Sequence, residues 1–311
     1  MRRRGWYEAW LILCPRRSPV PALTSLDTPA LLSWFAGAGR PLPWREQGVT
    51  AWEILLCEVM SQQTPVARVE PIWRQWLERW PGPRELAAAA PADVIRMWGK
   101  LGYPRRALRL RECAVVVVEK FNGEVPTEVD DLLSLPGVGD YTARAVACFA
   151  HGQAVPVVDT NVRRVVARAV NGRAEAGPPS NRRDLAAVES LLPARREEAV
   201  AFSVAIMELG ALVCTARNPD CEVCPLAATC AWVAAGKPAW DGPRRKVQTY
   251  AGTDRQVRGM LLDVLRDGDG TATAARLDAV WPDAEQRGRA LASLLDDGLV
   301  ACVGENYSLP T

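Results

Sequence analysis

The chain has 311 residues, more than one small core usually organises, so two or three packed units are expected. Hydrophobic residues make up 49% and charged residues 24% of the chain, which is typical of globular proteins and excludes a disordered polymer. His151 is the only histidine, so we expect neither a Ser-His-Asp triad, nor a Cys-His dyad, nor multi-histidine zinc catalysis. Acid–base chemistry therefore falls to carboxylates or tyrosine.

The net charge of +2 is unevenly placed along the chain. Residues 1–26 hold five arginines and one glutamate, which leaves 33 of the 38 basic and 35 of the 36 acidic side chains for the rest. Global charge therefore argues neither for nor against nucleic acid as a partner, and local clusters must decide it.

The first 26 residues look superficially like a signal peptide, with a basic start and an apolar stretch. Glu8 interrupts that stretch and no small-x-small cleavage site follows, so we expect a disordered extension or an over-long start, and a cytoplasmic protein. No apolar run reaches the roughly 20 residues that cross a bilayer, so no membrane partner is expected. Nine cysteines in such a compartment favour thiols or metal ligands over disulfides.

Periodic apolar residues predict helices over most of the chain. Residues 51–60 place five apolar side chains on one stripe at helical spacing: Trp52, Leu55, Leu56, Val59 and Met60. Further helices are expected at 28–36, 65–80, 91–99, 104–121, 128–134, 140–151, 161–169, 183–192 and 197–212. No strand-rich region is expected before residue 298, so the predicted body is all-helical.

The character of the chain changes after Cys230. Residues 236–254 combine Gly, Pro and a basic triplet at 244–246, which is typical of a linker lying over a surface. Residues 255–311 predict helices at 255–266, 273–280 and 284–296 and a hairpin near Gly304, an order that resembles a winged helix. Its 9 acidic against 6 basic residues argue against a DNA-reading module and favour a packing or partner module.

Four cysteines stand close together, with spacings of six, two and five residues between them: Cys214, Cys221, Cys224 and Cys230. Four thiolates this close can surround one metal centre at little cost in loop entropy. Structural zinc usually takes two CxxC-like pairs, and only one is present; disulfides and chance crowding are the plain alternatives. The spacing resembles the [4Fe-4S] loop of the endonuclease III and adenine glycosylase branch of DNA repair.

A glycine-rich turn, Gly137-Val138-Gly139, lies between two predicted helices. The glycines allow positive φ and close backbone approach, and the following helix start adds its dipole and free amides. Alone this is only a tight turn, but with the cysteine cluster downstream it predicts a helix-hairpin-helix element that binds a DNA phosphate. The nearby segment 100–111 holds five cations, no acid and Tyr103; a solvated basic face and a DNA-backbone contact with a side-chain wedge are equally good interpretations.

Two carboxylates occur in distinctive surroundings. Glu58 lies at the edge of the apolar stripe of helix 51–60, where partial desolvation raises the pKa of a carboxyl and lets it hold a proton near neutral pH. Asp159 follows an apolar run at a helix start, so on its own it is predicted as an N-cap, which stays ionised. A proton donor and a fixed anion are the pair that glycosidic bond cleavage needs.

From about Asp27 to Ala235 the chain resembles the adenine DNA glycosylase family of the helix-hairpin-helix superfamily. The motifs that carry the resemblance are LPWR (42–45), EVMSQQTPV (58–66), KLGYPRRA (100–107), LPGVGDYTARAV (135–146), VDTNVRRV (158–165), MELGA (207–211) and the cysteine loop. The resemblance implies an all-α, bilobed fold, with a six-helix lobe over 45–150 and an iron-sulfur lobe formed by 27–44 with 151–235. DNA would bind between the lobes with adenine flipped into the cleft.

The resemblance also implies roles for single residues. Glu58 is implied as the general acid at adenine N7, Asp159 as the stabiliser of the sugar cation or its covalent adduct, and Tyr141 as a residue lining the sugar. Related lyases place a Schiff-base lysine where Tyr141 stands, so a monofunctional enzyme is expected. The remaining implied sites are the adenine pocket (Trp44, Arg45 and Glu208), the duplex probes (Gln62, Gln63 and Tyr103) and the four cysteines as ligands of a [4Fe-4S] cluster.

The implied partner is double-stranded DNA with 8-oxoguanine:A or G:A mispairs, bound by a monomer at the nucleoid. Two features depart from the family: Ser61 replaces an apolar residue, and only 81 residues follow Cys230, too few for the hydrolase-like C-terminal domain of many members. Two alternatives stay open. One is a glycosylase for another base, such as mismatched thymine or an oxidised pyrimidine; the other is a non-catalytic, cluster-bearing DNA-binding protein.

Overall fold

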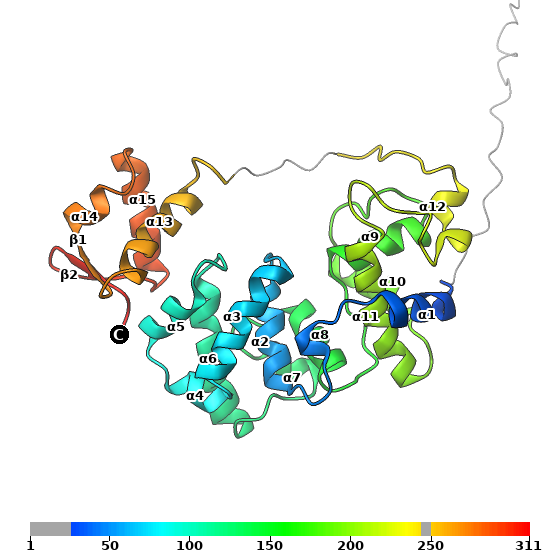
Figure 1. The fold of residues 1–311 in the computed structure, drawn as a ribbon, viewed down its shortest axis with the longest axis horizontal. Helices are drawn as coiled ribbons and strands as arrows, with labels where there is room; N and C mark the ends of the chain where they lie inside the picture. The colour runs from blue at the N-terminus through cyan, green and yellow to red at the C-terminus, as the bar shows by residue number, and fades with distance from the viewer. Residues whose placement is uncertain (1–25, 244–249) are drawn as a thin grey trace, which may run out of the picture.

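The computed structural model describes residues 26–243 and 250–311 (Figure 1). The expected extension over 1–26 and the basic triplet at 244–246 thus lie outside the described residues, apart from Leu26. Within the described part of the chain, none of the helices combines the length and apolar character that a membrane crossing requires.

The expected six-helix lobe begins after η1 (Pro43–Arg45) and contains the six helices that the sequence predicts and one more, the short α4. We keep the name six-helix lobe for it. Its core is rich in tryptophan: the ring of Trp76 packs edge-to-face against Trp80 and Trp98 at centroid distances of 5.0 and 5.6 Å. The short α4 has too few residues for helical periodicity to reveal it. The helices are α2 (Ala51–Ser61), α3 (Val66–Arg79), α4 (Pro83–Ala88), α5 (Pro91–Trp98), α6 (Arg105–Phe121), α7 (Val129–Leu133) and α8 (Asp140–Phe149).

The start of α2 is fixed by a capping box, which matters because α2 carries Glu58. The Thr50 hydroxyl accepts a hydrogen bond from the Glu53 amide at 3.3 Å, and the Glu53 carboxylate accepts one from the Thr50 amide. Such reciprocal pairs satisfy amides that the helix leaves free.

A second lobe joins the N-terminal helix to the chain after residue 159. Its core is separate from that of the first lobe and contains Leu31, Phe202 and Ile206, all fully buried. The 3-10 turn η1 (Pro43–Arg45) connects the lobes. The helices here are α1 (Thr28–Ala38), α9 (Thr160–Ala169), α10 (Asn181–Glu189), α11 (Arg196–Leu212) and α12 (Ala231–Ala234), with the short 3-10 turn η2 (Ala227–Thr229).

The C-terminal residues form a small module with its own core. Its three-stranded antiparallel sheet has the order β1-β3-β2, and Tyr307 on the central strand pairs with Ala272 and Cys302. The elements follow the winged-helix order expected from the sequence, and the sequence did not indicate the short strand at 271–273, which pairs with the hairpin just before the expected helix. The elements are α13 (Asp254–Arg266), β1 (Thr271–Thr273), α14 (Ala274–Asp278), α15 (Ala284–Asp296), β2 (Ala301–Val303) and β3 (Asn306–Ser308).

Candidate active site

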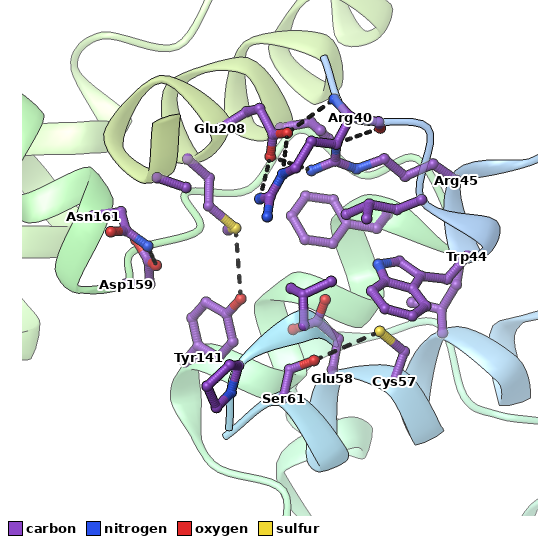
Figure 2. A pocket seen from close by; sticks show the side chains of 18 of the residues that line it. Arg40, Trp44, Arg45, Cys57, Glu58, Ser61, Tyr141, Asp159, Asn161 and Glu208 are labelled. Carbon is purple, nitrogen blue, oxygen red and sulfur yellow. Dashed lines mark hydrogen bonds and ion pairs between the residues drawn. The ribbon is translucent and has the colours of Figure 1, made fainter. Parts of the chain in front are cut away.

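A cavity of about 520 Å³ lies between the two lobes and brings together residues far apart in the chain. Its size is in the range of small-molecule sites. Figure 2 shows side chains from α2, α8, α11 and the start of α9 converging on this space. Six of the residues expected from the sequence line it: Trp44, Arg45, Glu58, Tyr141, Asp159 and Glu208.

Glu58 has the environment of a proton donor. It projects from α2 into the cavity next to Cys57 and Ser61, between buried residues of the helix. Burial raises the pKa of Glu58 to about 7, and the charge of Asp159 acts in the same direction. The Tyr141 hydroxyl and Arg45 act against this shift. At neutral pH a large fraction of Glu58 is therefore protonated.

Tyr141 lies between Glu58 and the opposite lobe. Its hydroxyl donates to the Met207 sulfur at 3.9 Å, and burial raises its pKa well above the usual value, as do the charges of Glu58 and Asp159. The phenol is therefore neutral, and it has no amine with which to form a Schiff base.

Asp159 caps α9 and also faces the cavity. One carboxylate oxygen accepts from the Val162 amide and the other from the Asn161 side chain, both at 2.7 Å. Burial, the largest cause, raises the pKa of Asp159 above its ordinary value, and these hydrogen bonds offset only part of that rise. The donors favour the anion, so the structural and chemical interpretations of Asp159 coexist in one side chain.

Glu208 anchors two arginines instead of presenting a free carboxylate to the cavity. It is only 1% exposed, and its oxygens accept from Arg40 Nε and Nη2 at 2.7 and 2.8 Å and from Arg45 Nη2 at 3.0 Å. Burial raises the pKa of Glu208, but these donors outweigh it and lower the pKa to about 2. The sequence did not point to Arg40, because it stands outside every recognised motif.

Trp44 and Ser61 shape the remaining wall. The Trp44 ring packs edge-to-face on Trp73 at 5.7 Å, and the Arg45 guanidinium lies 5.6 Å from the Phe35 ring centroid. The Ser61 hydroxyl lies 3.8 Å from the Cys57 sulfur. A flat aromatic wall with a few polar groups is well suited to a purine.

A groove of about 1000 Å³ adjoins the cavity and contains the predicted hairpin glycines. Gly137 has φ of +80°, and a Cβ there would come within 3.0 Å of the Arg109 side chain. No side chain caps α8 at Gly139, and the space where its Cβ would stand is open. Amides at this helix start are thus accessible to an anion.

Two of the three predicted duplex probes, Gln62 and Gln63, line the same groove, and Tyr103 is not among its lining residues. Gln62 donates to the Thr142 hydroxyl at 3.1 Å, which ties α2 to α8. Gln63 is exposed and has φ of +57°, a conformation that non-glycine residues rarely adopt outside functional sites.

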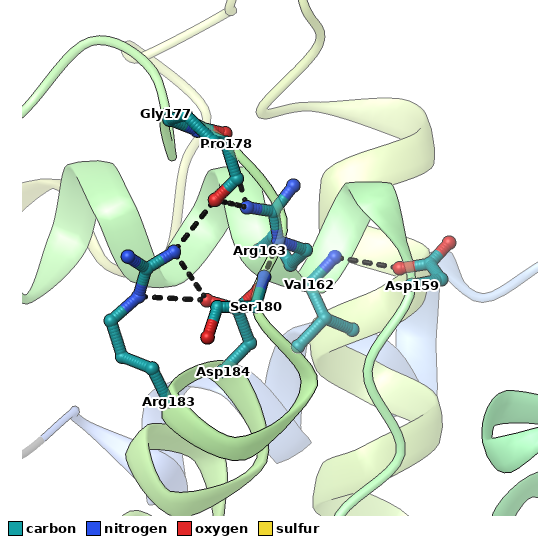
Figure 3. Close-up of polar contacts among 8 residues, drawn as sticks. All are labelled: Asp159, Val162, Arg163, Gly177, Pro178, Ser180, Arg183 and Asp184. Carbon is teal, nitrogen blue, oxygen red and sulfur yellow. Dashed lines mark hydrogen bonds and ion pairs between the residues drawn. The ribbon is translucent and has the colours of Figure 1, made fainter.

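Arg163 builds the far wall of the groove. Its guanidinium pairs with Asp184 at 2.7 Å and donates to the carbonyls of Gly177 and Pro178 (Figure 3). Because these contacts use the guanidinium within the protein, Arg163 orders the wall next to Asp159 and is not a free cation.

The four cysteines of the predicted loop share one enclosed space with Arg168 and Trp232. None of the four is joined in a disulfide. Arg168, 4% exposed, donates to the Cys214 sulfur at 3.5 Å and to the Thr215 carbonyl at 2.7 Å. Four soft sulfur donors with an adjacent cation fit an anionic iron-sulfur cluster.

The basic segment 100–111 is largely used inside the protein, so DNA-backbone contact is not its main role. Lys100 and Arg105 pair with Asp263 and Asp297 of the C-terminal module. Arg106 donates to the carbonyls of Val59, Met60 and Gly102. Arg109 pairs with Glu112, and Arg111 donates to the Ala89 carbonyl.

Comparison with known proteins agrees with this geometry. Residues 56–188 match the HhH-GPD superfamily of base excision DNA repair proteins, and residues 214–230 match the iron-sulfur binding domain of endonuclease III. The chain is 58% identical over 301 residues to an adenine DNA glycosylase of Mycobacterium tuberculosis, covering 95% of this chain and 98% of that one. It is 61% identical over 277 residues to the adenine DNA glycosylase of Mycolicibacterium smegmatis, covering 89% and 93%.

Among solved structures, a thermostable thymine-DNA glycosylase matches with a TM-score of 0.61 at 27% identity, over 67% of this chain and 95% of that one. The fold and the cavity therefore define a helix-hairpin-helix DNA N-glycosylase with a [4Fe-4S] loop. Within that class, the two mycobacterial relatives show that the chain belongs to the adenine DNA glycosylase family. It removes adenine in base excision repair.

Proposed function

We propose that this glycosylase acts on adenine opposite 8-oxoguanine or guanine in duplex DNA, as a monofunctional monomer at the nucleoid in the cytoplasm. The observation that carries the proposal is that Glu58 and Asp159 line one cavity in different surroundings: burial raises the pKa of Glu58 to about 7, whereas two hydrogen-bond donors reach the Asp159 carboxylate. A flipped adenosine placed there would have a proton donor at its base and an anion at its sugar.

The reaction follows from these two groups. Glu58 gives its proton to adenine N7, and the bond between C1′ and N9 breaks with its electrons moving into the base. Asp159 stabilises the positive charge left on the sugar, either as an ion pair or as a covalent adduct. Water then adds to C1′ and returns a proton to Glu58, so that adenine and an abasic site are the products. Tyr141 offers no amine for a Schiff base, so strand cleavage is not expected.

Other residues bind and orient the substrate in this proposal. Trp44 and Arg45 enclose the base, with Glu208 fixing Arg45. Amides of the 137–139 turn bind a phosphate, and Gln62, Gln63 and Tyr103 contact the duplex. Cys214, Cys221, Cys224 and Cys230 hold the [4Fe-4S] cluster, whose iron–sulfur bonds cross-link residues 214–230.

We propose the same boundaries for the domains as the sequence indicates: 45–150 and 27–44 with 151–235 for the two lobes, and 255–311 for the module. The separate apolar cores of the three regions support this division.

Single-turnover measurements on three duplexes test the proposal. The enzyme should release adenine from 8-oxoguanine:A and G:A mispairs and leave T:G intact, and strands should break only after later alkaline treatment. Thymine release with no adenine release would overturn the assignment in favour of the alternative that the similarity to a thymine-DNA glycosylase raises.

A further inference from the structure

The C-terminal module docks on the six-helix lobe through an apolar contact. Helix α5 divides its side chains between two cores: Val94 and Trp98 join the lobe, whereas Ile95 is fully buried in the core of the module. Ala92 and Leu108 pack against the same cluster. Burial of Ile95 excludes water from the contact, so the module is seated on the lobe.

Complementary charges surround this contact. Arg105 pairs with Asp297 at 3.1 Å and Lys100 with Asp263 at 3.7 Å, each joining the basic segment to the module. Arg96 of α5 also donates to the Asp269 carbonyl at 3.3 Å. Two acidic residues of the module thus face the basic segment of the lobe, and these pairs help to orient the module on it.

The docked module reaches Tyr103, which lies in the loop just before α6. Tyr103 is 41% exposed and has φ of +47°, so its backbone is held in a costly conformation. The base of its loop is fixed by Arg106, which donates to the Gly102 carbonyl at 2.9 Å and lies 5.8 Å from the Tyr103 ring centroid.

Arg255 of the module holds the exposed end of the same ring. Its Nη1 donates to the Tyr103 hydroxyl at 2.7 Å, and its guanidinium lies 5.6 Å from the Tyr103 ring centroid. The same guanidinium lies 5.3 Å from the Tyr250 ring centroid. Tyr103 is therefore contacted by two arginines from two different folding units.

We propose that the C-terminal module braces the Tyr103 loop through Arg255, so that the ring is already positioned when duplex DNA arrives. This inference rests on the proposed function, which assigns Tyr103 to duplex probing. Arg255 is then a positioning residue: it acts through the Tyr103 hydroxyl and removes the cost of ordering an exposed, strained loop on binding.

The test uses the full chain with Glu58→Gln, so that binding and base extrusion are measured without base release. The duplex carries a G:A mispair with 2-aminopurine next to the adenine, and its fluorescence reports extrusion. Arg255→Ala should weaken binding and slow extrusion about tenfold, the size expected for losing one charged hydrogen bond with its stacking. Tyr103→Phe keeps the ring and removes the hydroxyl, so it should also weaken binding and slow extrusion, but less than Arg255→Ala does.

The double variant separates positioning from direct DNA contact. Arg255→Ala should reduce duplex binding and extrusion much less when Tyr103→Phe is already present than when Tyr103 is intact. The salt dependence of binding should stay unchanged. Arg289→Ala is the matched control, because this exposed arginine of the module forms ion pairs with Asp254 and Glu285; it should bind and extrude as the parent does.

Two results would overturn the brace. One is an Arg255→Ala variant that binds and extrudes like the parent. The other is an Arg255→Ala variant that loses the same DNA affinity with Tyr103 as with Tyr103→Phe, while the slope of log affinity against log salt concentration falls by about 1. That result would indicate that Arg255 contacts a DNA phosphate directly. Failure of the unmodified enzyme to release adenine would count against the proposed function and leave this test intact.

Discussion

Glu58 and Asp159 show how local surroundings give two carboxyl groups different jobs. Glu58 lies among apolar residues of α2, and burial is the largest cause of its raised pKa. Asp159 is also buried, but an amide and an Asn side chain donate to it. Donors favour the anion and apolar burial favours the acid, so these surroundings support the proposed roles of Glu58 as the acid and Asp159 as the anion.

The raised pKa of Glu58 predicts how activity changes with pH. A general acid works only when protonated, so the rate constant for adenine release should fall through pH 7, by about tenfold per unit well above it. Single-turnover rates from pH 5.5 to 9 on a G:A duplex would measure this. A rate constant that stays flat up to pH 9 would show that no group titrating near 7 supplies the proton.

The two roles of Asp159 can be separated by substitution. Asp159→Asn keeps an oxygen that caps α9, so its melting temperature should stay close to that of the unmodified protein. Loss of the anion should lower the rate of adenine release by about 10²-fold or more. Asp283→Asn, at the cap of α15, is the matched control and should retain full activity. Equal loss in both variants would contradict a chemical role for Asp159.

Sequence reasoning reached the residues that lie in local patterns, and the resemblance to a family added those in its motifs, such as Trp44 and Glu208. Glu58 and Asp159 were predicted because a helical stripe and a helix start define their surroundings. Arg40 and Met207 were not, since their contacts with Glu208 and Tyr141 join positions 168 and 66 residues apart. Side-chain contacts between residues this far apart in the chain form only after folding and leave no periodic signal in the sequence.

At the scale of elements, the hairpin before α8 depends on backbone geometry. Gly137→Ala introduces a Cβ at positive φ against the Arg109 side chain, which should destabilise the protein by about 1 kcal/mol or more. It should also weaken duplex binding equally for mispaired and matched DNA, because a phosphate contact carries no sequence information.

Gly123→Ala provides the control for that prediction. It has φ of +86° and a similar 3.0 Å approach, to Arg84, but it follows the far end of α6. A comparable loss of stability with unchanged DNA affinity is expected. If Gly137→Ala bound duplex DNA as tightly as Gly123→Ala does, the phosphate site would not be at the hairpin.

Elements with strong periodicity were predictable, and the shortest ones were not. The stripe of α2 gave a clear helix, whereas α4 (Pro83–Ala88) and β1 (Thr271–Thr273) are too short to show a period and depend on packing. The charge of segment 100–111 was visible, but its partners Asp263 and Asp297 lie on a separate unit, so the sequence left its role open.

At the scale of the whole molecule, Glu208 joins α11 to the segment that leads into the six-helix lobe. Its pKa of about 2, against 4.5 in an ordinary glutamate, means that the ionised form is stabilised by folding. That stabilisation, about 3 kcal/mol at most, is present above pH 4.5 and is lost as pH falls towards 2.

Glu208→Gln should therefore lower the melting temperature by roughly 5 °C at pH 7. The difference from the unmodified protein should shrink as pH is lowered from 5 towards 3. Glu70→Gln, which removes an exposed partner of Arg74, should change the melting temperature little. A Glu208→Gln variant with the same melting temperature as the unmodified protein at pH 7 would show that the Glu208 carboxylate does not stabilise the fold.

Adenine release by Glu58→Gln tests the central claim most directly. Glutamine fills the same space and cannot transfer a proton, and above pH 7 it also avoids burying a charge, so the variant should fold and bind G:A duplex at least as well as the unmodified enzyme. Single-turnover assays should detect no adenine release by the variant over many half-lives of the unmodified reaction. Release at a comparable rate would contradict Glu58 as the acid and, with it, the mechanism built on the shared cavity.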